Sequence, residues 1–599
     1  MILKLFKPLL KTATLLHEAS SFILTVPYAV KTAGSLGKTF QQSRRVYKRK
    51  GGIGLINYWK QMGFDRRNII LEPTDVIEKI KKGDLVIILT TQHTVYIAEL
   101  FKKSLGKIGV NTEIIFDSHA SEYSDSWHIV ICPNMFTHLP RFYYAYQMEQ
   151  SVSSKWFTKG YFNRLFRAKA VFDYSIANIA YLQRNGVPFQ KLFYMPVGLL
   201  GSDIVQPDSS YTYDVLFYGD VNCPRRRLFL DKLKSKFKVK ELIGVFGDEL
   251  RKELSKAKII VNVHYYENAL LETTRIYECL SLNKLVISET SADQKDHQDL
   301  HEVVDFTEIG NVDQMIERIE YWLGHSEEYK SRIQLIKNLK NESDKFQFYF
   351  YRFLLSQDII DFETFYSLSA DYIKPENDFW CLSLPESIER RADFDRDNKF
   401  GIVVIPGLRH SMGWVGCGLS YKFMMRRAYD FNLKNVTICE DDVLFFDNFE
   451  KRYSNIKNAL TKTFHDWDVF SGLIADLSED VEVQNTEIKI PDERIYKISH
   501  MVSMVCNIYN QQVYEKLANW DETNRDTSNT IDRYIEQHEG VNGLVVSPFL
   551  VGHKEDLNST LWGFDNGRYS EMIRKSQILL NSKIFELSGD IDVIEQIEN

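Results

Sequence analysis

Continuous apolar runs alternate with stretches of helical period along most of the chain. Residues 85–91 form one such run, rich in β-branched side chains, and residues 95–105 follow it with apolar positions at helical spacing. A strand that is apolar on both faces is typical of a parallel sheet covered by helices on both sides. Further strand-like segments lie at 112–116, 127–132, 213–219, 238–243, 257–263 and 284–288. The pattern predicts two successive Rossmann-like halves of parallel β-α-β units between about residues 70 and 345.

A third α/β unit is predicted after a long helical stretch. Residues 315–366 are charged and of helical period, and we expect this helix pair to pack back on the first module. An apolar strand pattern resumes at 379–384. The predicted parts are a basic helical arm at 1–70, a GT-B-like first Rossmann half at 71–205, a second half with its terminal helices at 206–366, and a GT-A-like α/β domain at 377–595. In such folds, ligands bind at the carboxyl ends of the strands.

Charge is distributed unevenly along the chain. The net charge is -7, yet the first 67 residues carry 13 Lys and Arg against Glu18 and Asp65 alone. A basic segment that also contains apolar stretches fits an anionic membrane face better than a nucleic acid. The alternative is a solvated helix that packs on the acidic body. Both interpretations remain open.

The apolar runs and the cysteines indicate in which cellular compartment we expect the protein. The longest apolar run near the start has about a dozen residues and includes Pro27, whereas a membrane span needs roughly 18. The seven cysteines are scattered, with no Cys-x-x-Cys pair, which favours a reducing compartment and argues against structural zinc. We therefore expect a cytoplasmic protein, with peripheral attachment to the inner face of the membrane through the basic arm as the alternative.

Three consecutive carboxylates follow an apolar strand in the last unit. Residues 436–439 are apolar or β-branched, and Glu440, Asp441 and Asp442 come directly after them. Carboxylates placed side by side repel one another, and burying them without a counterion costs several kcal/mol. A divalent cation removes this cost, and oxygen ligands suit Mg²⁺ or Mn²⁺, which can bridge a diphosphate. The alternative is a solvated acidic turn.

Two further segments accompany this triplet. The strand pattern at 382–384 leads into Arg390 and Arg391, and residues 413–420 (GWVGCGLS) begin a helical run. In this order, followed by the Glu-Asp-Asp strand end, the segments resemble glycosyltransferase family 25, of the lipopolysaccharide-biosynthesis type, over about 220 residues. The resemblance implies a GT-A fold, a nucleotide-sugar donor and a divalent metal, Mn²⁺ or Mg²⁺.

The resemblance also implies roles for these residues. Asp442 would bind the metal directly, with Glu440 beside it, and Asp441 would brace the ribose or act in the chemistry. Arg390 and Arg391 would face the donor phosphates, where a guanidinium can hold two oxygens. Gly413 and Gly416 would permit close backbone approach at the start of the helix.

Several positions of this unit depart from the family or leave alternatives open. Tyr421 stands where the family usually has a His, and the stretch between the double Arg and the helix start is short. Asp532 matches a second acidic position and is a candidate catalytic base or acceptor-binding acid; the alternative is a helix cap. His553 is a candidate for the metal shell, with a purely structural His as the alternative.

A second constellation lies in the Rossmann-like halves. Gly219 ends a strand, Arg225 to Arg227 follow it, and Glu272, Arg275 and Glu278 lie farther on. Together with the surrounding pattern, these residues resemble GT-B glycosyltransferases of the glycogen-synthase-like group. The resemblance implies that Gly219 admits the donor diphosphate, that Arg225 to Arg227 neutralise its charge and that Glu278 holds the ribose hydroxyls. This fold needs no metal, because helix dipoles and basic side chains stabilise the leaving diphosphate.

The likeness to GT-B enzymes is incomplete. Leu270 stands where the group has a second Glu, and Glu272 is the nearest acid. Ion pairing along a helix face is the alternative explanation of the three-residue spacing from Glu272 to Glu278. His93, after the first strand, is placed as a catalytic or phosphate-stabilising residue would be, and Asp117 and His119 follow the second strand likewise.

Both resemblances point to a two-module glycosyltransferase. The expected substrates are nucleotide sugars, plausibly UDP-galactose for the second module, and a glycan or glycolipid acceptor in lipopolysaccharide or other surface polysaccharide assembly. One alternative is that only the C-terminal module is catalytic, while the first is a scaffold that binds the acceptor. The other is a metal-dependent nucleotide-sugar hydrolase or nucleotidyltransferase on the same framework.

Overall fold

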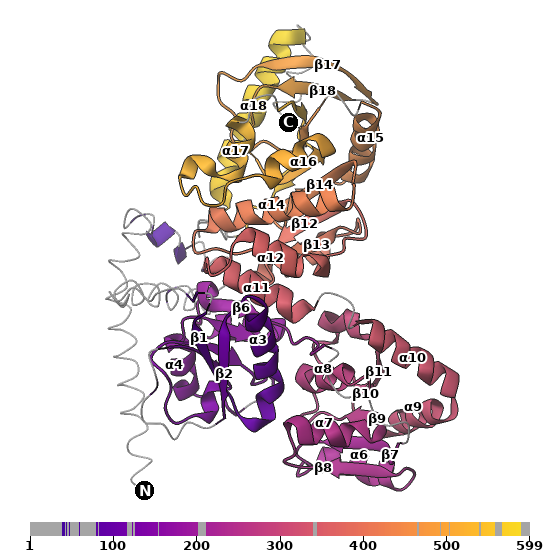
Figure 1. Cartoon of the computed structure of the whole chain (residues 1–599). Coiled ribbons are helices and arrows are strands. Elements are labelled where there is room, and N and C mark those ends of the chain that lie inside the picture. Colours follow the sequence, from indigo (N-terminus) through magenta and orange to yellow (C-terminus); the bar gives the residue numbers. More distant parts are fainter. Residues whose placement is uncertain are drawn as a thin grey trace. The chain divides into compact units, whose positions relative to one another are not determined.

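The chain folds into two units in the computed structural model (Figure 1). One unit consists of Met1–Met195 and Asp203–Ile333, and the other of Pro196–Ser202 and Gln334–Asn599. The structure describes residues 80–588, apart from 82, 117–122, 124–125, 154, 202–210, 340–343, 464–466, 492, 502, 538–540 and 558–565, together with residues 37, 39–41, 43, 44, 47 and 59. Most of the expected basic arm at 1–70 therefore lies outside the described residues.

A six-stranded sheet forms the first half of the first unit. Its strand order is β2-β1-β3-β4-β5-β6, and all neighbouring strands are parallel. The central strands are almost completely buried, as their continuous apolar sequences predict. The strands are β1 (Leu85–Leu89), β2 (Asn111–Ile115), β3 (Trp127–Ile131), β4 (Tyr143–Gln147), β5 (Val171–Asp173) and β6 (Leu192–Tyr194), and the helices are α3 (Val95–Lys107), α4 (Lys159–Arg167) and α5 (Ile176–Arg184).

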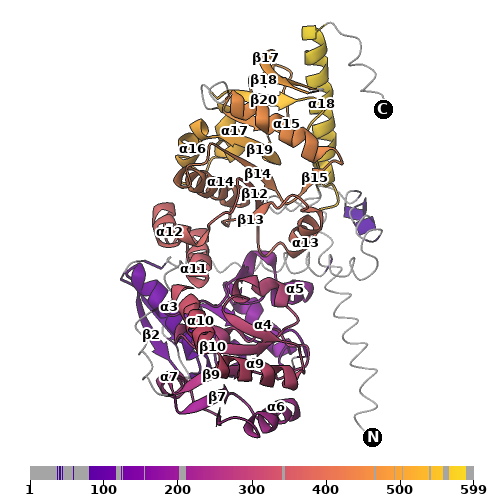
Figure 2. The same cartoon turned by 90° about the vertical axis from the view of Figure 1, so that its right-hand side faces the viewer.

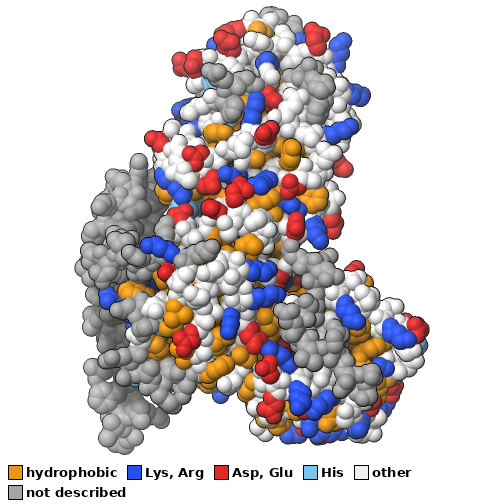
Figure 3. All heavy atoms as spheres, viewed as in Figure 1, with side chains coloured by type: hydrophobic (Ala, Val, Ile, Leu, Met, Phe, Trp, Pro, Cys, Tyr) orange, Lys and Arg blue, Asp and Glu red, His pale blue; other side chains and the backbone are white. Residues whose placement is uncertain are grey.

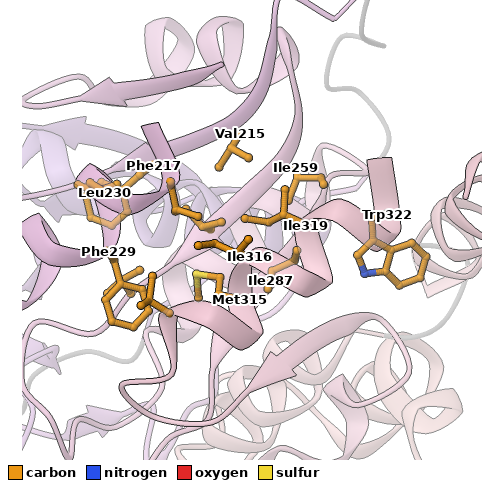
Figure 4. Packing of buried hydrophobic residues seen from close by; sticks show 14 of the residues in the cluster. Val215, Phe217, Phe229, Leu230, Ile259, Ile287, Met315, Ile316, Ile319 and Trp322 are labelled. Atoms are coloured by element: carbon orange, nitrogen blue, oxygen red, sulfur yellow. The ribbon is translucent and has the colours of Figure 1, made fainter. Parts of the chain in front are cut away.

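A five-stranded parallel sheet forms the second half, in the order β11-β10-β9-β7-β8. Its core joins strand residues such as Phe217 and Ile259 to Phe229 and Ile316 of two helices (Figure 4). The strands are β7 (Tyr213–Tyr218), β8 (Val239–Leu242), β9 (Ala257–Asn262), β10 (Leu285–Glu289) and β11 (Val304–Thr307); the helices are α6 (Pro224–Lys234), α7 (Gly247–Ser255), α8 (Thr273–Ser281), α9 (Val312–Gly324) and α10 (Ser326–Leu339). The two predicted Rossmann-like halves are thus confirmed.

The two halves of the first unit meet near the carboxyl ends of their strands. The Tyr96 hydroxyl lies 2.9 Å from the Ser281 hydroxyl, so α3 of the first half touches α8 of the second. The Gln150 side chain, just after β4, bonds both to the backbone N–H and to the carbonyl of Leu270, at 3.1 Å each. These contacts bring residues that follow β1 and β4 against the second half.

An eight-stranded mixed sheet forms the body of the second unit (Figure 2), in the order β13-β12-β14-β19-β16-β20-β18-β17. A separate two-stranded sheet pairs β15 with β21. The strands are β12 (Phe379–Ser383), β13 (Val403–Pro406), β14 (Asn435–Glu440), β15 (Val443–Phe445), β16 (Val469–Ser471), β17 (Val483–Ile490), β18 (Glu493–Ile498), β19 (Cys506–Asn510), β20 (Gly543–Val546) and β21 (Val551–His553). The helices are α11 (Lys345–Ser356), α12 (Phe362–Ser369), α13 (Ile388–Asp397), α14 (Gly413–Asp430), α15 (Phe449–Lys462), α16 (Gln511–Ala518), α17 (Ile531–Gln537) and α18 (Gly567–Ser588).

Helices α11 and α12 belong to the second unit, whereas the sequence analysis placed residues up to 366 with the first module. Phe348 of α11 and Phe365 of α12 pack against Phe423 of α14. Arg352 of α11 is fully buried and forms a two-point ion pair with Glu386 at 2.7 and 3.0 Å. Aromatic packing and this buried ion pair attach the two helices to the C-terminal sheet, so the boundary lies near residue 334.

Charged side chains of both signs are interspersed on the face shown in Figure 3. The lysine-rich stretch after α6 illustrates this mixing, because Lys234 pairs with Glu241 at 2.7 Å and Lys236 with Glu320 at 3.1 Å. None of the helices in the described part of the chain is both long enough and apolar enough to span a bilayer.

Candidate active sites

The acidic triplet lies at the carboxyl end of β14, in the interior of the C-terminal sheet. Glu440 is the last residue of this strand, and Asp441 and Asp442 form the turn into β15. The antiparallel pairing of β15 with β21 places Val443 opposite His553. Because neighbouring strands enclose the turn, Asp441 and Asp442 are each only 4% exposed. The triplet is therefore not a solvated acidic turn.

Arg390 supplies a positive charge to this cluster. Its Nε donates to Asp441 Oδ1 at 2.6 Å, and its Nη2 lies 2.8 Å from Asp442 Oδ2. The Ser383 hydroxyl, at the end of β12, donates to Asp441 Oδ2 at 2.7 Å. Burial opposes the charged guanidinium, but Asp442 and Asp441 raise the pKa of Arg390 above its usual value. The predicted phosphate-facing Arg390 thus also serves as a counterion for two carboxylates.

The two oxygens of Asp442 have unlike surroundings. Oδ2 accepts from Asn566 Nδ2 at 2.9 Å and lies 3.2 Å from His553 Nε2, in addition to its contact with Arg390. Oδ1 is buried and has no hydrogen-bond partner among the residues that the structure describes. Burial disfavours ionisation here, yet Arg390, followed by His553 and Asn566, holds the pKa of Asp442 below its ordinary value. Asp442 is therefore an ionised carboxylate with one unsatisfied oxygen.

Glu440 differs from its neighbour in charge state. Burial, followed by the charge of Asp442, raises the pKa of Glu440 to about 8. The charge of Asp532 contributes to the same shift, so that side chain lies near the triplet. Asp532 is in the first turn of α17, and its Oδ1 accepts from the Arg533 backbone N–H at 2.9 Å. Two of the predicted acids thus share one site, Glu440 neutral at pH 7.

Other residues predicted for this site have different surroundings. Arg391 pairs with Asp395 on the surface, at 2.9 Å, while its neighbour Arg390 reaches the carboxylates. Gly413 is the first residue of α14. A Cβ on Gly416 would lie 2.9 Å from the backbone N of His410 and 3.1 Å from the carbonyl O of Leu408. The close approach at Gly416 therefore accommodates the preceding loop of the same chain.

The groups around Asp442 include types that bind divalent cations, and the Arg390 guanidinium also lies among them, with Nη2 2.8 Å from Asp442 Oδ2. Among the described residues, no three His, Cys, Asp or Glu side chains are grouped closely enough to hold a metal ion, so Glu440 does not join Asp442 and His553 in such a group. Each of Asp442, His553 and Asn566 has a buried oxygen or nitrogen without a described partner. Carboxylate, imidazole and amide groups are all common ligands of Mn²⁺ or similar ions. Asn566 stands in none of the sequence motifs.

Gly219 forms the centre of the site in the first unit. It follows β7 with a φ of +133°, a conformation that side-chain-bearing residues rarely adopt. A Cβ there would lie 3.0 Å from Nη2 of Arg275 and 3.5 Å from Nη1 of Arg226. Two guanidinium groups therefore flank the bare backbone at the end of this strand. Backbone of this kind beside cationic side chains is suited to a phosphate group.

Of the three expected arginines, Arg226 lies beside Gly219, whereas Arg225 points to a carboxylate. Arg225 forms a two-point ion pair with the buried carboxylate of Glu289, which also accepts from the His264 and Gly310 backbone N–H groups. Arg226 is 4% exposed, and its Nη1 donates to the Asp220 carbonyl at 2.9 Å. Burial and the nearby Arg275 lower the pKa of Arg226 to about 10, so it remains charged at neutral pH.

Glu272 and Glu278 have different surroundings in this site. Glu272 accepts from His264 Nδ1 at 2.5 Å and lies 3.5 Å from Arg226 and 3.9 Å from Arg275. Glu278 accepts from the Tyr218 hydroxyl at 3.2 Å, and burial raises its pKa to about 7. Simple ion pairing along the helix face therefore does not account for these residues, since His264, which follows β9, and Tyr218 of β7 both lie outside α8.

His93 lies in the short helical turn Gln92–Thr94 after β1, as the sequence analysis predicts. Its Nδ1 is 2.8 Å from the Thr91 hydroxyl, and its ring centroid is 6.2 Å from that of Phe246 in the second half. Burial lowers the pKa of His93, which favours the neutral imidazole. His93 thus faces the second half of its own unit. Asp117 and His119 lie outside the described residues.

Comparisons with known proteins give fold likenesses only. No protein-family model matches the chain, and no curated protein matches it. Sucrose-phosphate synthase from Thermosynechococcus elongatus is 11% identical, over 47% of this chain and 96% of that one, with a TM-score of 0.32. HepE from Anabaena, in complex with UDP and glucose, is 8% identical over 43% and 94%, with a TM-score of 0.30. An α1,3-fucosyltransferase with GDP is 12% identical over 43% and 84%, with a TM-score of 0.25. These identities and scores are too low to assign a function.

Proposed function

We propose that this chain is a glycosyltransferase with two catalytic modules, each of which uses a nucleotide-sugar donor. The proposed acceptor is a growing glycan or glycolipid of lipopolysaccharide or another surface polysaccharide. The observation that carries the proposal is the buried cluster of Asp441, Asp442 and Arg390 at the end of β14, in which Asp442 Oδ1 has no described partner. Such a cluster at a strand end is suited to a cation and a diphosphate.

In the C-terminal module, Asp442 and His553 are proposed to hold the divalent metal, which when bound neutralises charge on the leaving nucleotide diphosphate. Asp441 positions Arg390, because both of its oxygens are engaged by Arg390 and Ser383. Asp532 is the proposed base that takes the proton from the acceptor hydroxyl. Burial, followed by the charge of Asp442, raises the pKa of Glu440 above its ordinary value.

In the N-terminal module, the donor diphosphate is proposed to lie over Gly219, between Arg226 and Arg275. The two guanidinium groups lie close to the Glu272 carboxylate and place positive charge beside Gly219. This charge can stabilise a leaving diphosphate without a metal. Glu278 is the proposed partner of the ribose hydroxyls, and His93 the proposed catalytic group from the opposite half of the unit.

The test is a screen of nucleotide sugars for release of the nucleoside diphosphate by the full chain. It is run with and without Mn²⁺ and with extracts of surface glycan as acceptor, on the wild type, Asp442→Asn and Arg275→Ala. We expect two separable transfers, of which Asp442→Asn removes the one that needs Mn²⁺ and Arg275→Ala the other. Loss of a single transfer by Asp442→Asn, with no turnover dependent on Arg275, would indicate that the first module only binds the acceptor. Diphosphate release without any acceptor product would indicate a hydrolase instead.

A further inference from the structure

His264 lies beside the proposed donor site of the first unit and is fully buried. It follows β9 by two residues. Its Nδ1 is 2.5 Å from Glu272 Oε2, and its Nε2 is 3.0 Å from the carbonyl oxygen of Thr290. Both ring nitrogens therefore face an oxygen, and the imidazole cannot turn without losing a hydrogen bond.

The two partners determine which protons the ring carries. A carbonyl oxygen can only accept, so Nε2 of His264 carries a hydrogen. A carboxylate also only accepts, so Nδ1 carries a second hydrogen as long as Glu272 is ionised. With both protons in place, His264 is an imidazolium whose positive charge lies against the Glu272 carboxylate.

Three neighbours keep Glu272 ionised. The Asn262 side chain accepts from Arg275 through its Oδ1, which directs its Nδ2 toward Glu272 Oε2, at 3.1 Å. Arg226 Nη2 and Arg275 Nη1 lie 3.5 and 3.9 Å from Glu272 Oε1. Burial opposes the charged carboxylate, but His264, and after it the two arginines, hold the pKa of Glu272 below its ordinary value. The proton shared by the two side chains therefore belongs to His264.

Other charged groups also contact this residue. The backbone N–H of His264 donates to Glu289 Oε2 at 2.8 Å, and Arg225 donates to the His264 carbonyl at 3.1 Å. Arg225 and Glu289 form an ion pair with each other. Burial lowers the pKa of His264, but Glu272 and then Glu289 outweigh burial, and the net shift is upward. Glu272 is thus the main carboxylate that sets the charge of the ring.

The Glu272 carboxylate lies closer to His264 than to either arginine. A hydrogen bond between a guanidinium and a carboxylate is ordinarily about 2.7–2.9 Å long, so the distances of 3.5 and 3.9 Å are not short ion pairs. Arg275 Nη2 and Arg226 Nη1 lie instead 3.0 and 3.5 Å from the position that a Cβ on Gly219 would occupy. Without the imidazolium, the carboxylate would attract both guanidinium groups toward itself.

We propose that His264 is a positioning residue of the first module, which as a buried imidazolium neutralises Glu272. The guanidinium groups of Arg226 and Arg275 then stay beside Gly219, where they hold the donor diphosphate. His264 acts on the diphosphate only through these side chains, because both of its ring nitrogens are engaged. This inference rests on the proposed donor site of the first module and deepens it.

The alternative is that His264 only anchors the loop after β9. The two roles predict different results when His264→Asn is combined with Glu272→Gln. The asparagine amide can still donate a hydrogen bond to Glu272 but carries no charge, so a positioning role predicts loss of diphosphate binding. Removal of the carboxylate charge by Glu272→Gln should then restore binding. An anchoring role predicts that the second substitution restores nothing.

Binding of UDP, GDP and inorganic pyrophosphate to the full chain is measured by isothermal titration calorimetry in EDTA. We expect His264→Asn to raise the Kd of the tightest ligand about 10-fold, the scale of one coupled contact in an ion-pair network. The double variant should return to within about 3-fold of the wild type. His325→Gln, at an exposed position of the same unit, is the control and should be unchanged. Thermal unfolding checks that each variant is folded.

The charge of the ring is measured by NMR on the full chain with isotopically labelled histidine. The signal that is lost in His264→Asn identifies this residue among the 14 histidines. We expect His264 to keep both ring protons to a higher pH than an ordinary histidine does. Glu272→Gln should lower that pH, because it removes the carboxylate that stabilises the imidazolium. A purely anchoring residue would show neither effect.

Two results would overturn the inference: a neutral His264 ring at pH 7, or no recovery of binding in the double variant. If His264→Asn does not fold, the histidine signals in Glu272→Gln decide, and the absence of any shift counts against the inference. If a ligand binds and Arg275→Ala abolishes binding, but the double variant shows no recovery, the donor site stands and the inference fails. If the wild type binds none of the three ligands, the proposed donor site fails and the inference with it.

Discussion

The two proposed donor sites differ in the charge that they present to a leaving diphosphate. In the first unit, Arg226 and Arg275 flank Gly219, and the carboxylate of Glu272 lies close to both. In the second, Asp441 and Asp442 surround the single guanidinium of Arg390. A leaving diphosphate can interact directly with the first site, whereas the second repels it unless a cation is added. For the same leaving diphosphate, we therefore expect transfer without a metal in the first module and metal-dependent transfer in the second.

The largest expected effect comes from Asp442→Asn. Loss of this ionised ligand should reduce the Mn²⁺-dependent transfer about 1,000-fold, because the metal contributes several kcal/mol of charge stabilisation. The metal-independent transfer should not change. Both rates are measured by release of the nucleoside diphosphate from the full chain. Equal loss of both transfers would contradict the division into two independent sites.

Arg275→Ala should impair the proposed donor site of the first unit. Removal of one of the two cations beside Gly219 should lower the metal-independent transfer about 100-fold, the usual cost of deleting a preorganised group that stabilises a developing anion. Steady-state kinetics with and without EDTA separate this transfer from the other. Arg184→Ala, on an exposed helical position of the same unit, is the control. Addition of Mn²⁺ restoring the rate would show that a metal can replace the missing guanidinium.

The Glu278 carboxyl provides a further test, through the pH dependence of the free energy of unfolding. Burial raises its folded pKa to about 7, from an ordinary value of 4.5, so its neutral form is favoured in the native state. The stability that it contributes is therefore present below about pH 4.5 and is lost as the pH rises through about 7. Chemical denaturation should show that the wild type loses up to about 3 kcal/mol relative to Glu278→Gln between pH 5 and 8. A parallel pH dependence in both proteins would exclude Glu278 as the titrating group.

Arg391→Ala has the smallest expected effect. Its ion pair with Asp395 is on the surface, and such pairs contribute about 0–1 kcal/mol. We expect less than a twofold change in either transfer and almost no change in unfolding temperature, in contrast to a large loss for Arg390→Ala. A loss in Arg391→Ala comparable to that in Arg390→Ala would restore the sequence-based view that both arginines face the donor.

The parallel sheets of the first unit follow directly from sequence pattern, but the exact site residues do not. Buried strands such as β1 and β9 can be recognised in the sequence by their largely apolar runs. Successive helical residues point about 100° apart, so spacing alone cannot decide between Arg225 and Arg226 or between Arg390 and Arg391. Here one member of each pair enters the proposed site and the other has a carboxylate partner elsewhere.

Other features depend on contacts that are distant in sequence. All residues of α11 from Phe346 to Ser356 are buried, so no apolar stripe indicates which unit the helix faces. Asn566 belongs to no motif, and only the fold brings it to Asp442. The position of Asp441 and Asp442 at the end of a buried strand could be predicted, because the largely apolar and β-branched segment 436–439 comes shortly before them.

The pairing of β15 with β21 has a consequence for synthesis of the chain. The acidic turn leaves the ribosome more than a hundred residues before His553 and Asn566, its partners 111 and 124 positions later. Until those residues emerge, the nascent domain holds carboxylates that cannot yet be enclosed, and contacts this far apart form slowly. We therefore expect this domain to mature only after translation has nearly finished, and shortened chains that end before residue 553 to be substrates for cellular proteases.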